Sequence, residues 1–202
     1  MLNAELRTLL TADGSPVCNV SVDLSAEQLA VSARCADAVR LRRYRGDELS
    51  TDDVLALREH FGCDDLRGKK YVLTWTYHPR PLNTAVANSA LTIATRYGMD
   101  VTLLCPTDDY LLDDRYMQRA RDNVAAHGGL LTISHDPQQA YRGADVVYAK
   151  SWGALPYFGR WEQEKPIRDA HRHFIVDEQK MALTNSAVFS HCLPLRRNDK
   201  AT

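Results

Sequence analysis

From Lys69 onward, short runs rich in β-branched and aromatic residues alternate with longer amphipathic stretches. This alternation is typical of parallel strands joined by crossover helices. It predicts an α/β fold with a doubly wound, Rossmann-like parallel sheet flanked by helices, whose ligands bind at the carboxyl ends of the strands. The predicted strands are Tyr71–Tyr77, Val101–Cys105, Leu130–Ser134, Val146–Ala149, Phe174–Val176 and Val188–His191.

The stretches between these runs predict the crossover helices. Residues Asn83–Tyr97 carry apolar side chains at helical spacing, and Gly98 follows as a residue suited to a left-handed cap. A second helix is predicted at Asp113–His127, a short third at Asp136–Tyr141 and a fourth within Pro166–His173.

The first 50 residues do not follow this pattern. They offer one plausible helix, Ser25–Arg43, with Ser25 as its N-cap. A helix is then predicted at Thr51–Phe61, capped by Thr51 and ended by Gly62. We therefore divide the chain into an N-terminal segment, residues 1–50, that the pattern does not assign, and an α/β domain, residues 51–202.

The charge balance and hydropathy of the chain argue against nucleic acid and membranes as binding partners. The chain has 25 Lys plus Arg against 26 Asp plus Glu, and no run of like charge. No apolar stretch approaches the ~20 residues of a spanning helix, and the N-terminus does not resemble a signal peptide. These features favour a soluble, cytoplasmic protein that binds neither nucleic acid nor a membrane.

Five cysteines are widely spaced, without a C-x-x-C pair or histidines at ligand spacing. A disulfide framework or a metal site is therefore not expected. Cys18, Cys35, Cys63 and Cys105 are interpreted as small apolar residues. Cys192 differs because it follows His191 at the end of an apolar run.

The sequence from His191 to Asn198, HCLPLRRN, directly follows a predicted strand. It places an imidazole, a thiol and two backbone amides at the carboxyl edge of the sheet, where this fold keeps its ligands. A buried strand-end histidine followed by a strand-terminating proline is an equally good interpretation of the pattern alone. A Cys-His hydrolase is a further alternative, which would require a histidine brought to the thiol by the fold.

HCLP after a strand resembles the signature of the carbamoyltransferases, and HCLPLRRN followed by DKAT is similar to their acetylornithine branch. The stretches LREHFGCDDLRGKKYVLTWTYHPRPLNTAVANSALTIA, DVTLLCP and ADVVYAKSWGALPYFG agree, so that the resemblance covers residues 52–202. It implies transfer of a carbamoyl group from carbamoyl phosphate to the side-chain amine of N-acetylornithine in arginine biosynthesis. It also implies a homotrimer and no cofactor.

The resemblance also implies roles for the residues at the end of the chain. His191 would donate a hydrogen bond to the carbamoyl oxygen, while Cys192 and Leu193 would line the zone where the amine meets the carbamoyl group. Lys200 would be carboxylated on its side-chain nitrogen, although an ordinary exposed lysine is an equally good interpretation.

The second substrate is predicted from the Lys150-Ser151-Trp152-Gly153 segment. Lys150 suits a carboxylate, and Trp152 offers an apolar wall to a neutral acyl group. Asn83 could supply an amide contact, and the resemblance places it near the substrate. The structural alternatives are a strand-end charge for Lys150, a core side chain for Trp152 and an N-cap for Asn83. Ornithine and N-succinylornithine remain neighbouring substrate choices.

The family's phosphate-binding Ser-x-Arg-Thr-Arg loop does not occur in these 202 residues. We therefore expect a fragment that lacks the carbamoyl-phosphate domain and does not transfer the group at an enzyme's rate alone. The alternative is a non-catalytic small-molecule-binding domain. His78-Pro79 is assigned to a loop, and Arg196-Arg197 to a solvated face or a subunit contact.

Overall fold

The computed structural model describes residues 51–191. The chain divides into two compact units, Met1–Phe61 and Gly62–Thr202. The described part of the first unit is helix α3 (Thr51–Phe61), with the bounds that the sequence predicts. The predicted helix at Ser25–Arg43 and the assignment of residues 1–50 lie outside the described residues.

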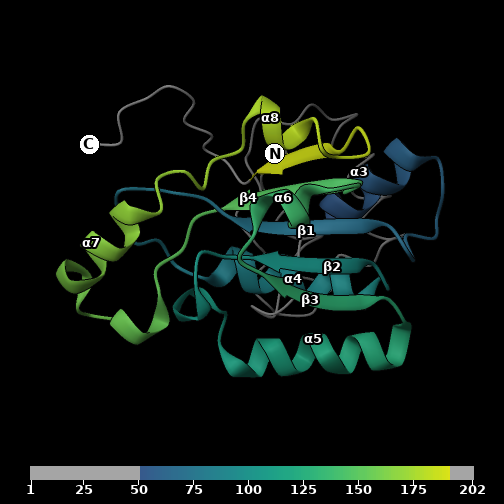
Figure 1. Cartoon of the computed structure of the whole chain (residues 1–202). Coiled ribbons are helices and arrows are strands. Elements are labelled where there is room, and N and C mark those ends of the chain that lie inside the picture. The colour runs from purple at the N-terminus through teal and green to yellow at the C-terminus, as the bar shows by residue number, and fades with distance from the viewer. Residues whose placement is uncertain (1–50, 192–202) are drawn as a thin grey trace, which may run out of the picture. The chain divides into compact units, whose positions relative to one another are not determined.

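The second unit is built on a five-stranded parallel sheet in the order β3-β2-β1-β4-β5 (Figure 1). The chain adds β2 and β3 on one side of β1, then crosses to add β4 and β5 on the other, which confirms the doubly wound α/β prediction. The strands are β1 (Lys70–Trp75), β2 (Asp100–Leu104), β3 (Leu130–Ser134), β4 (Val146–Lys150) and β5 (Val188–His191).

Helices cover both faces of this sheet. Because parallel crossovers are right-handed, helices that accompany opposite directions of strand addition lie on opposite faces. Helix α4 packs on α5, and α6 packs on α8 (Figure 1). The helices are α4 (Ala85–Arg96), η1 (Asp108–Tyr110), α5 (Asp114–His127), α6 (Pro137–Tyr141), η2 (Leu155–Tyr157), α7 (Trp161–Ala170) and α8 (Glu178–Met181).

Burial follows position in the sheet. Every residue of β4 is buried, and in β1 only Lys70 at its amino end is exposed. The edge strand β3 is mostly exposed or half-buried, and Leu130 keeps 60% of its surface exposed. A parallel strand covered by helices on both faces needs a continuous apolar run, which YVLTW and VVYA supply.

Short polar signals set the helix ends. The carboxylate of Asp113 accepts a hydrogen bond from the amide of Arg115 at the start of α5. Asp136 caps α6 in the same way through the amide of Gln138, with Pro137 at the first helical position. Gly98 adopts φ of +67° after α4, a backbone conformation that favours glycine, as the sequence predicts.

Two sequence predictions are corrected. Residues Phe174–Val176 form no strand: the amide of Phe174 bonds to the carbonyl of His171 in a turn, and its ring packs against Trp75. Its apolar character therefore serves core packing and not a sheet. Helix α7 begins at Trp161, before the predicted start, because Pro166 lies inside the helix instead of opening it.

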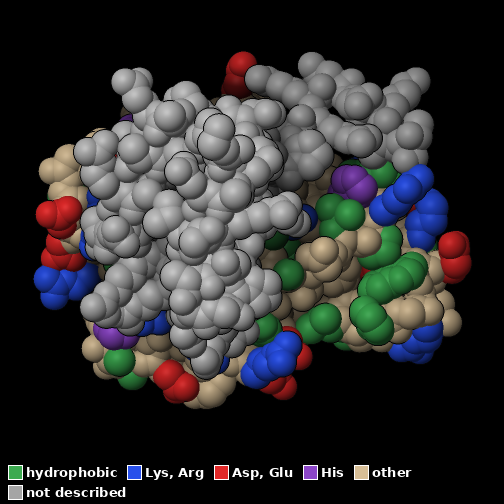
Figure 2. All heavy atoms as spheres, turned by 180° about the vertical axis from the view of Figure 1, so that it is seen from behind, with side chains coloured by type: hydrophobic (Ala, Val, Ile, Leu, Met, Phe, Trp, Pro, Cys, Tyr) green, Lys and Arg blue, Asp and Glu red, His purple; other side chains and the backbone are tan. Residues whose placement is uncertain are grey.

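None of the described helices is long and apolar enough to cross a membrane. Figure 2 shows basic side chains beside acidic ones at several places on the described part of one face. Hydrophobic side chains also gather on that face, toward the side of the molecule that carries α7 in Figure 1.

Candidate functional site

The carboxyl ends of β1, β4 and β5 meet at one edge of the sheet. In the parallel register Trp75 lies opposite Lys150, and Ala149 lies opposite His191. Lys150 and His191, predicted from distant parts of the sequence, therefore end neighbouring strands. The strand order reverses between β1 and β4, which is where doubly wound folds form a ligand crevice.

Lys150 is a mostly buried residue that carries a basic group. Its residue keeps only 8% of its surface exposed, and no hydrogen bond or ion pair joins its ammonium to another residue in the range 51–191. A buried charge is costly unless an opposite charge or hydrogen bonds compensate it. This setting suits an anionic group beside the ammonium of Lys150.

His191 is the last described residue and is half-buried at the end of β5. The other predicted residues of the terminal segment, Cys192, Leu193 and Lys200, lie outside the described residues. Their roles, and that of the His191 imidazole, stay predictions.

Asn83 is exposed just before α4. Its side-chain oxygen accepts a hydrogen bond from the amide of Ala85 at 3.2 Å, a local turn contact just before α4, whose N-cap position is Thr84 and not Asn83. That contact uses the oxygen and leaves the side-chain NH2 group as a donor. Substrate contact by Asn83 stays a prediction, and the NH2 group is the part available for it.

Trp152 is fully buried, with 0% of its surface exposed. Its indole Nε1 donates to the carbonyl of Tyr110 at 2.8 Å, and its own carbonyl accepts from the indole Nε1 of Trp75 at 2.8 Å. Trp152 is therefore a core residue that fixes the path of the chain leaving β4. Its contact with an acyl group stays a prediction.

Two loops form the edge of the candidate site: the β1 loop, residues 76–84, and the β4 loop, residues 151–154. They touch at Gly153, whose amide donates to the carbonyl of Leu82 at 2.8 Å. A Cβ at Gly153 would lie 2.9 Å from Cβ of Pro81, so only glycine permits this approach without a shift. The His78-Pro79 pair lies in the β1 loop, as predicted.

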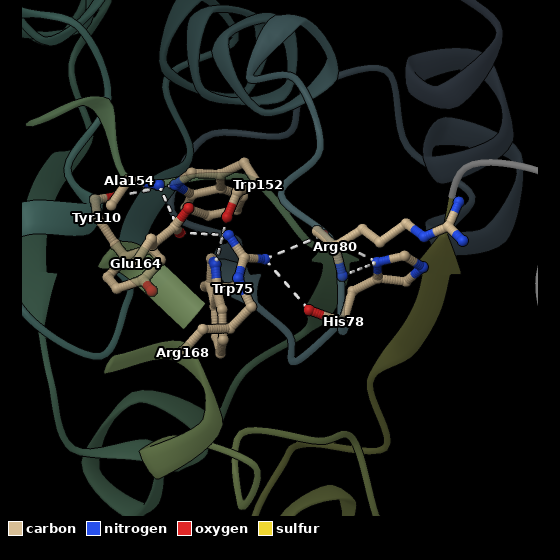
Figure 3. A network of polar contacts seen from close by, with 8 residues as sticks. All are labelled: Trp75, His78, Arg80, Tyr110, Trp152, Ala154, Glu164 and Arg168. Atoms are coloured by element: carbon tan, nitrogen blue, oxygen red, sulfur yellow. Dashed lines mark hydrogen bonds and ion pairs between the residues drawn. The ribbon is translucent and has the colours of Figure 1, made fainter. Parts of the chain in front are cut away.

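A buried ion pair on α7 joins the same two loops (Figure 3). The Glu164 carboxylate and the Arg168 guanidinium bond to each other with at most 1% of either side chain exposed. The Glu164 carboxylate also accepts from the amide of Ala154 at 2.9 Å. Arg168 donates to the carbonyls of His78 and Arg80 at 3.2 and 3.1 Å.

The sequence pattern did not predict this pair. Its signal was the four-residue spacing of opposite charges, which places Glu164 and Arg168 on one face of a helix. Exposed pairs of this kind are common, and nothing in the spacing shows that this one is buried.

A second cluster fixes Tyr77 at the start of the β1 loop. Its hydroxyl donates to the Asp169 carboxylate at 2.7 Å, and the Arg172 guanidinium lies 5.3 Å from its ring centroid. Hydrogen bonds from Lys165 and then Tyr77 hold the pKa of Asp169 well below its ordinary value. Helix α7 thus holds the β1 loop at two points.

Cys105 does not have the character of a nucleophile, although its Sγ lies 3.9 Å from Nδ1 of His135. The residue is fully buried, and burial raises the pKa of its thiol to about 12. The thiol is therefore protonated at neutral pH, and the interpretation of Cys105 as a small apolar residue fits. Cys63 is half-buried, whereas Cys18 and Cys35 lie outside the described residues.

Comparison with known proteins gives the same family by two routes. Residues 73–202 match the family described as "Aspartate/ornithine carbamoyltransferase, Asp/Orn binding domain". The chain is 79% identical over 149 residues to an N-acetylornithine carbamoyltransferase of Xanthomonas campestris pv. campestris, covering 74% of this chain and 44% of that protein. It is 36% identical over 129 residues to an N-succinylornithine carbamoyltransferase of Bacteroides fragilis, covering 64% of this chain and 36% of that protein.

Among solved structures, a crystal structure of acetylornithine transcarbamylase complexed with acetylcitrulline matches with a TM-score of 0.71 and 78% sequence identity. The match covers 72% of this chain and 44% of that chain. The chain thus spans less than half the length of these relatives. It belongs to the aspartate/ornithine carbamoyltransferase family, and residues 73–202 are its Asp/Orn binding domain.

Proposed function

We propose that the carboxyl edge of β1, β4 and β5 binds the amino-acid substrate of an N-acetylornithine carbamoyltransferase. The observation that carries the proposal is Lys150, a mostly buried lysine at the switch point of the sheet whose ammonium has no partner among residues 51–191. The substrate's α-carboxylate would supply the missing opposite charge. The 79% identity to an N-acetylornithine carbamoyltransferase supports the choice of substrate.

The acylated α-nitrogen sets the rest of the recognition. It carries no charge, so it needs an amide or apolar partner in place of a carboxylate. The NH2 group of Asn83 would donate to the acyl oxygen, because the oxygen of that side chain already accepts from the amide of Ala85. The wall of the site is the β4 loop, whose path Trp152 fixes.

The reaction that this site would serve is the attack of the side-chain amine on the carbamoyl carbon of carbamoyl phosphate. The new C–N bond forms, the C–O bond to phosphate breaks, phosphate leaves with the electron pair, and the amine loses a proton. Positioning and charge stabilisation dominate such a reaction. His191, on the strand beside Lys150, would donate a hydrogen bond to the carbamoyl oxygen as negative charge develops there.

The test is isothermal titration calorimetry of the full chain with N-acetylornithine, N-succinylornithine and ornithine, each with and without carbamoyl phosphate. We expect N-acetylornithine to bind most tightly of the three. Tighter binding of ornithine would contradict the proposed recognition of a neutral α-nitrogen. Binding of N-acetylornithine that carbamoyl phosphate does not change would favour the second candidate, a non-catalytic binding domain.

The proposal extends to the setting of the protein. We propose a cytoplasmic, homotrimeric protein that takes part in arginine biosynthesis, as the resemblance to acetylornithine enzymes implies. Sedimentation velocity of the chain tests the assembly, and a monomer at micromolar concentration would contradict it.

A further inference from the structure

We infer that the buried Glu164–Arg168 pair couples the β1 loop to the β4 loop, so that the two walls of the candidate site keep one geometry. Neither side chain needs to touch a ligand for this, and both are therefore positioning residues. The inference deepens the proposed function and rests on it for its consequence in substrate binding. The coupling itself is a property of the folded chain.

The side chain of Arg168 binds backbone carbonyls of the β1 loop. One terminal nitrogen of its guanidinium, Nη1, donates to the carbonyls of both His78 and Arg80. A planar guanidinium offers five donors in a fixed fork, whereas a lysine ammonium at the same place cannot reach these carbonyls and Glu164 with the same geometry. The loop that carries Asn83 is thus fixed from the side of α7.

The side chain of Glu164 likewise binds a backbone amide of the β4 loop. One carboxylate oxygen, Oε1, accepts from both the amide of Ala154 and the guanidinium of Arg168 (Figure 3). The other, Oε2, is buried without a hydrogen-bond partner among the described residues. The oxygen Oε1 of Glu164 therefore connects the β4 loop to Arg168, and Arg168 binds the β1 loop.

Burial makes this connection strong. Both side chains are excluded from water, so separating them would leave an uncompensated buried charge, which is strongly destabilising. The loops also touch directly at Gly153 and Leu82, and the pair lies outside that contact. A displacement of either loop must disturb the pair, and through it the other loop.

The structure offers a direct test by amide hydrogen–deuterium exchange of the full chain, followed by mass spectrometry of peptides. The variants are Glu164→Gln, which keeps an acceptor for Ala154 but removes the charge, and Arg168→Lys, which keeps a charge but removes the fork. We expect each variant to raise exchange about tenfold in both residues 76–84 and residues 151–158, including the loop that it does not touch.

The double variant separates coupling from two local effects. If the pair acts as one unit, Glu164→Gln/Arg168→Lys exchanges no faster than the faster single variant. Arg121→Lys on the exposed face of α5, a helix that packs on α4 and β3, makes the same chemical change outside both loops and should leave them unchanged. The β2 and β3 peptides report any global loss of structure, which would raise their exchange as well.

One pattern overturns the inference: exchange that rises only in residues 76–84 for Arg168→Lys and only in residues 151–158 for Glu164→Gln. If Arg168→Lys does not fold, unchanged exchange in residues 76–84 of Glu164→Gln overturns it alone. Calorimetry with N-acetylornithine then tests the consequence, an affinity about tenfold weaker in Glu164→Gln. Absence of binding by the unsubstituted chain would count against the proposed function and leave the exchange result valid.

Discussion

Lys150 is the residue on which the proposed substrate recognition depends. Replacing it by alanine should weaken N-acetylornithine binding by about 1.5–3 kcal/mol, the range for a hydrogen bond to a charged group. The matched control is Lys70→Ala, the same change at the amino end of the neighbouring strand β1, where the side chain is exposed. Calorimetry of both variants decides the matter, and equal affinities would remove Lys150 from the site.

For single residues, the sequence predicted the position along strands and loops better than it predicted the contacts of the side chain. Lys150 and His191 end neighbouring strands because both follow apolar runs, a local pattern that is readable from the chain. Trp152 was placed correctly in a loop, whereas the helix predicted to begin at Asn83 begins at Ala85. The bonds of these two side chains to Tyr110 and Ala85 depend on partners that the pattern does not identify. The pairing of Glu164 with Arg168 was missed for the same reason, since burial is a property of the assembled fold.

Among the elements, helix α7 binds the β1 loop at two places. One is the buried Glu164–Arg168 pair, and the other is the Asp169 carboxylate, which accepts a hydrogen bond from Tyr77. Asp169 has a folded-state pKa below its ordinary value of 3.8, so it contributes stability that is present above that value and is lost as pH falls through the lower, folded-state value. We therefore expect Asp169→Asn to lower the melting temperature at pH 7 and to have less effect at each step below pH 4.

Thermal unfolding followed by circular dichroism between pH 7 and pH 2 measures this dependence. Asp114→Asn, in the first turn of α5 away from the β1 loop, is a control for the loss of one surface carboxylate. A difference between Asp169→Asn and the unsubstituted chain that stays constant over the whole range would show that the charge of Asp169 does not stabilise the fold.

Periodicity predicted most elements and failed where tertiary contacts decide. The strands β3 and β5 have their predicted bounds, because each is a short apolar run between turns. The run Phe174–Val176 is also apolar but follows a turn, and the carbonyl of Phe174 instead accepts a hydrogen bond from the amide of Tyr77 while its ring packs on Trp75. An apolar triplet alone cannot distinguish these two fates.

For the whole molecule, stability should be concentrated at the centre of the sheet. Leu73 in β1 is fully buried, whereas Leu130 in the edge strand β3 is 60% exposed. We expect Leu73→Ala to lower the free energy of unfolding by about 2–5 kcal/mol, and Leu130→Ala by about 0.5 kcal/mol or less. Urea unfolding of the two variants, which remove the same atoms, provides the comparison; equal losses would contradict the burial gradient.

The overall architecture was the most predictable feature. Alternating strands and helices restrict a chain to parallel pairing with right-handed crossovers, which leaves few arrangements of five strands. The sequence pattern does not say at which strand the direction of addition reverses. That reversal, between β1 and β4, is what places the end of β4, with Lys150, beside the end of the central strand β1.

The connection of two loops to one helix has a consequence for exchanging parts between family members. A graft of the β4 loop alone, for example from an N-succinylornithine carbamoyltransferase, would have to meet Glu164 and Leu82 of this chain as they stand. The smallest transplantable module is therefore three segments far apart in the sequence: residues 76–84, residues 151–154 and α7. We therefore expect a change of substrate preference to require the exchange of all three segments together. A chimera with one exchanged loop should fold but bind the substrates of both parent proteins more weakly.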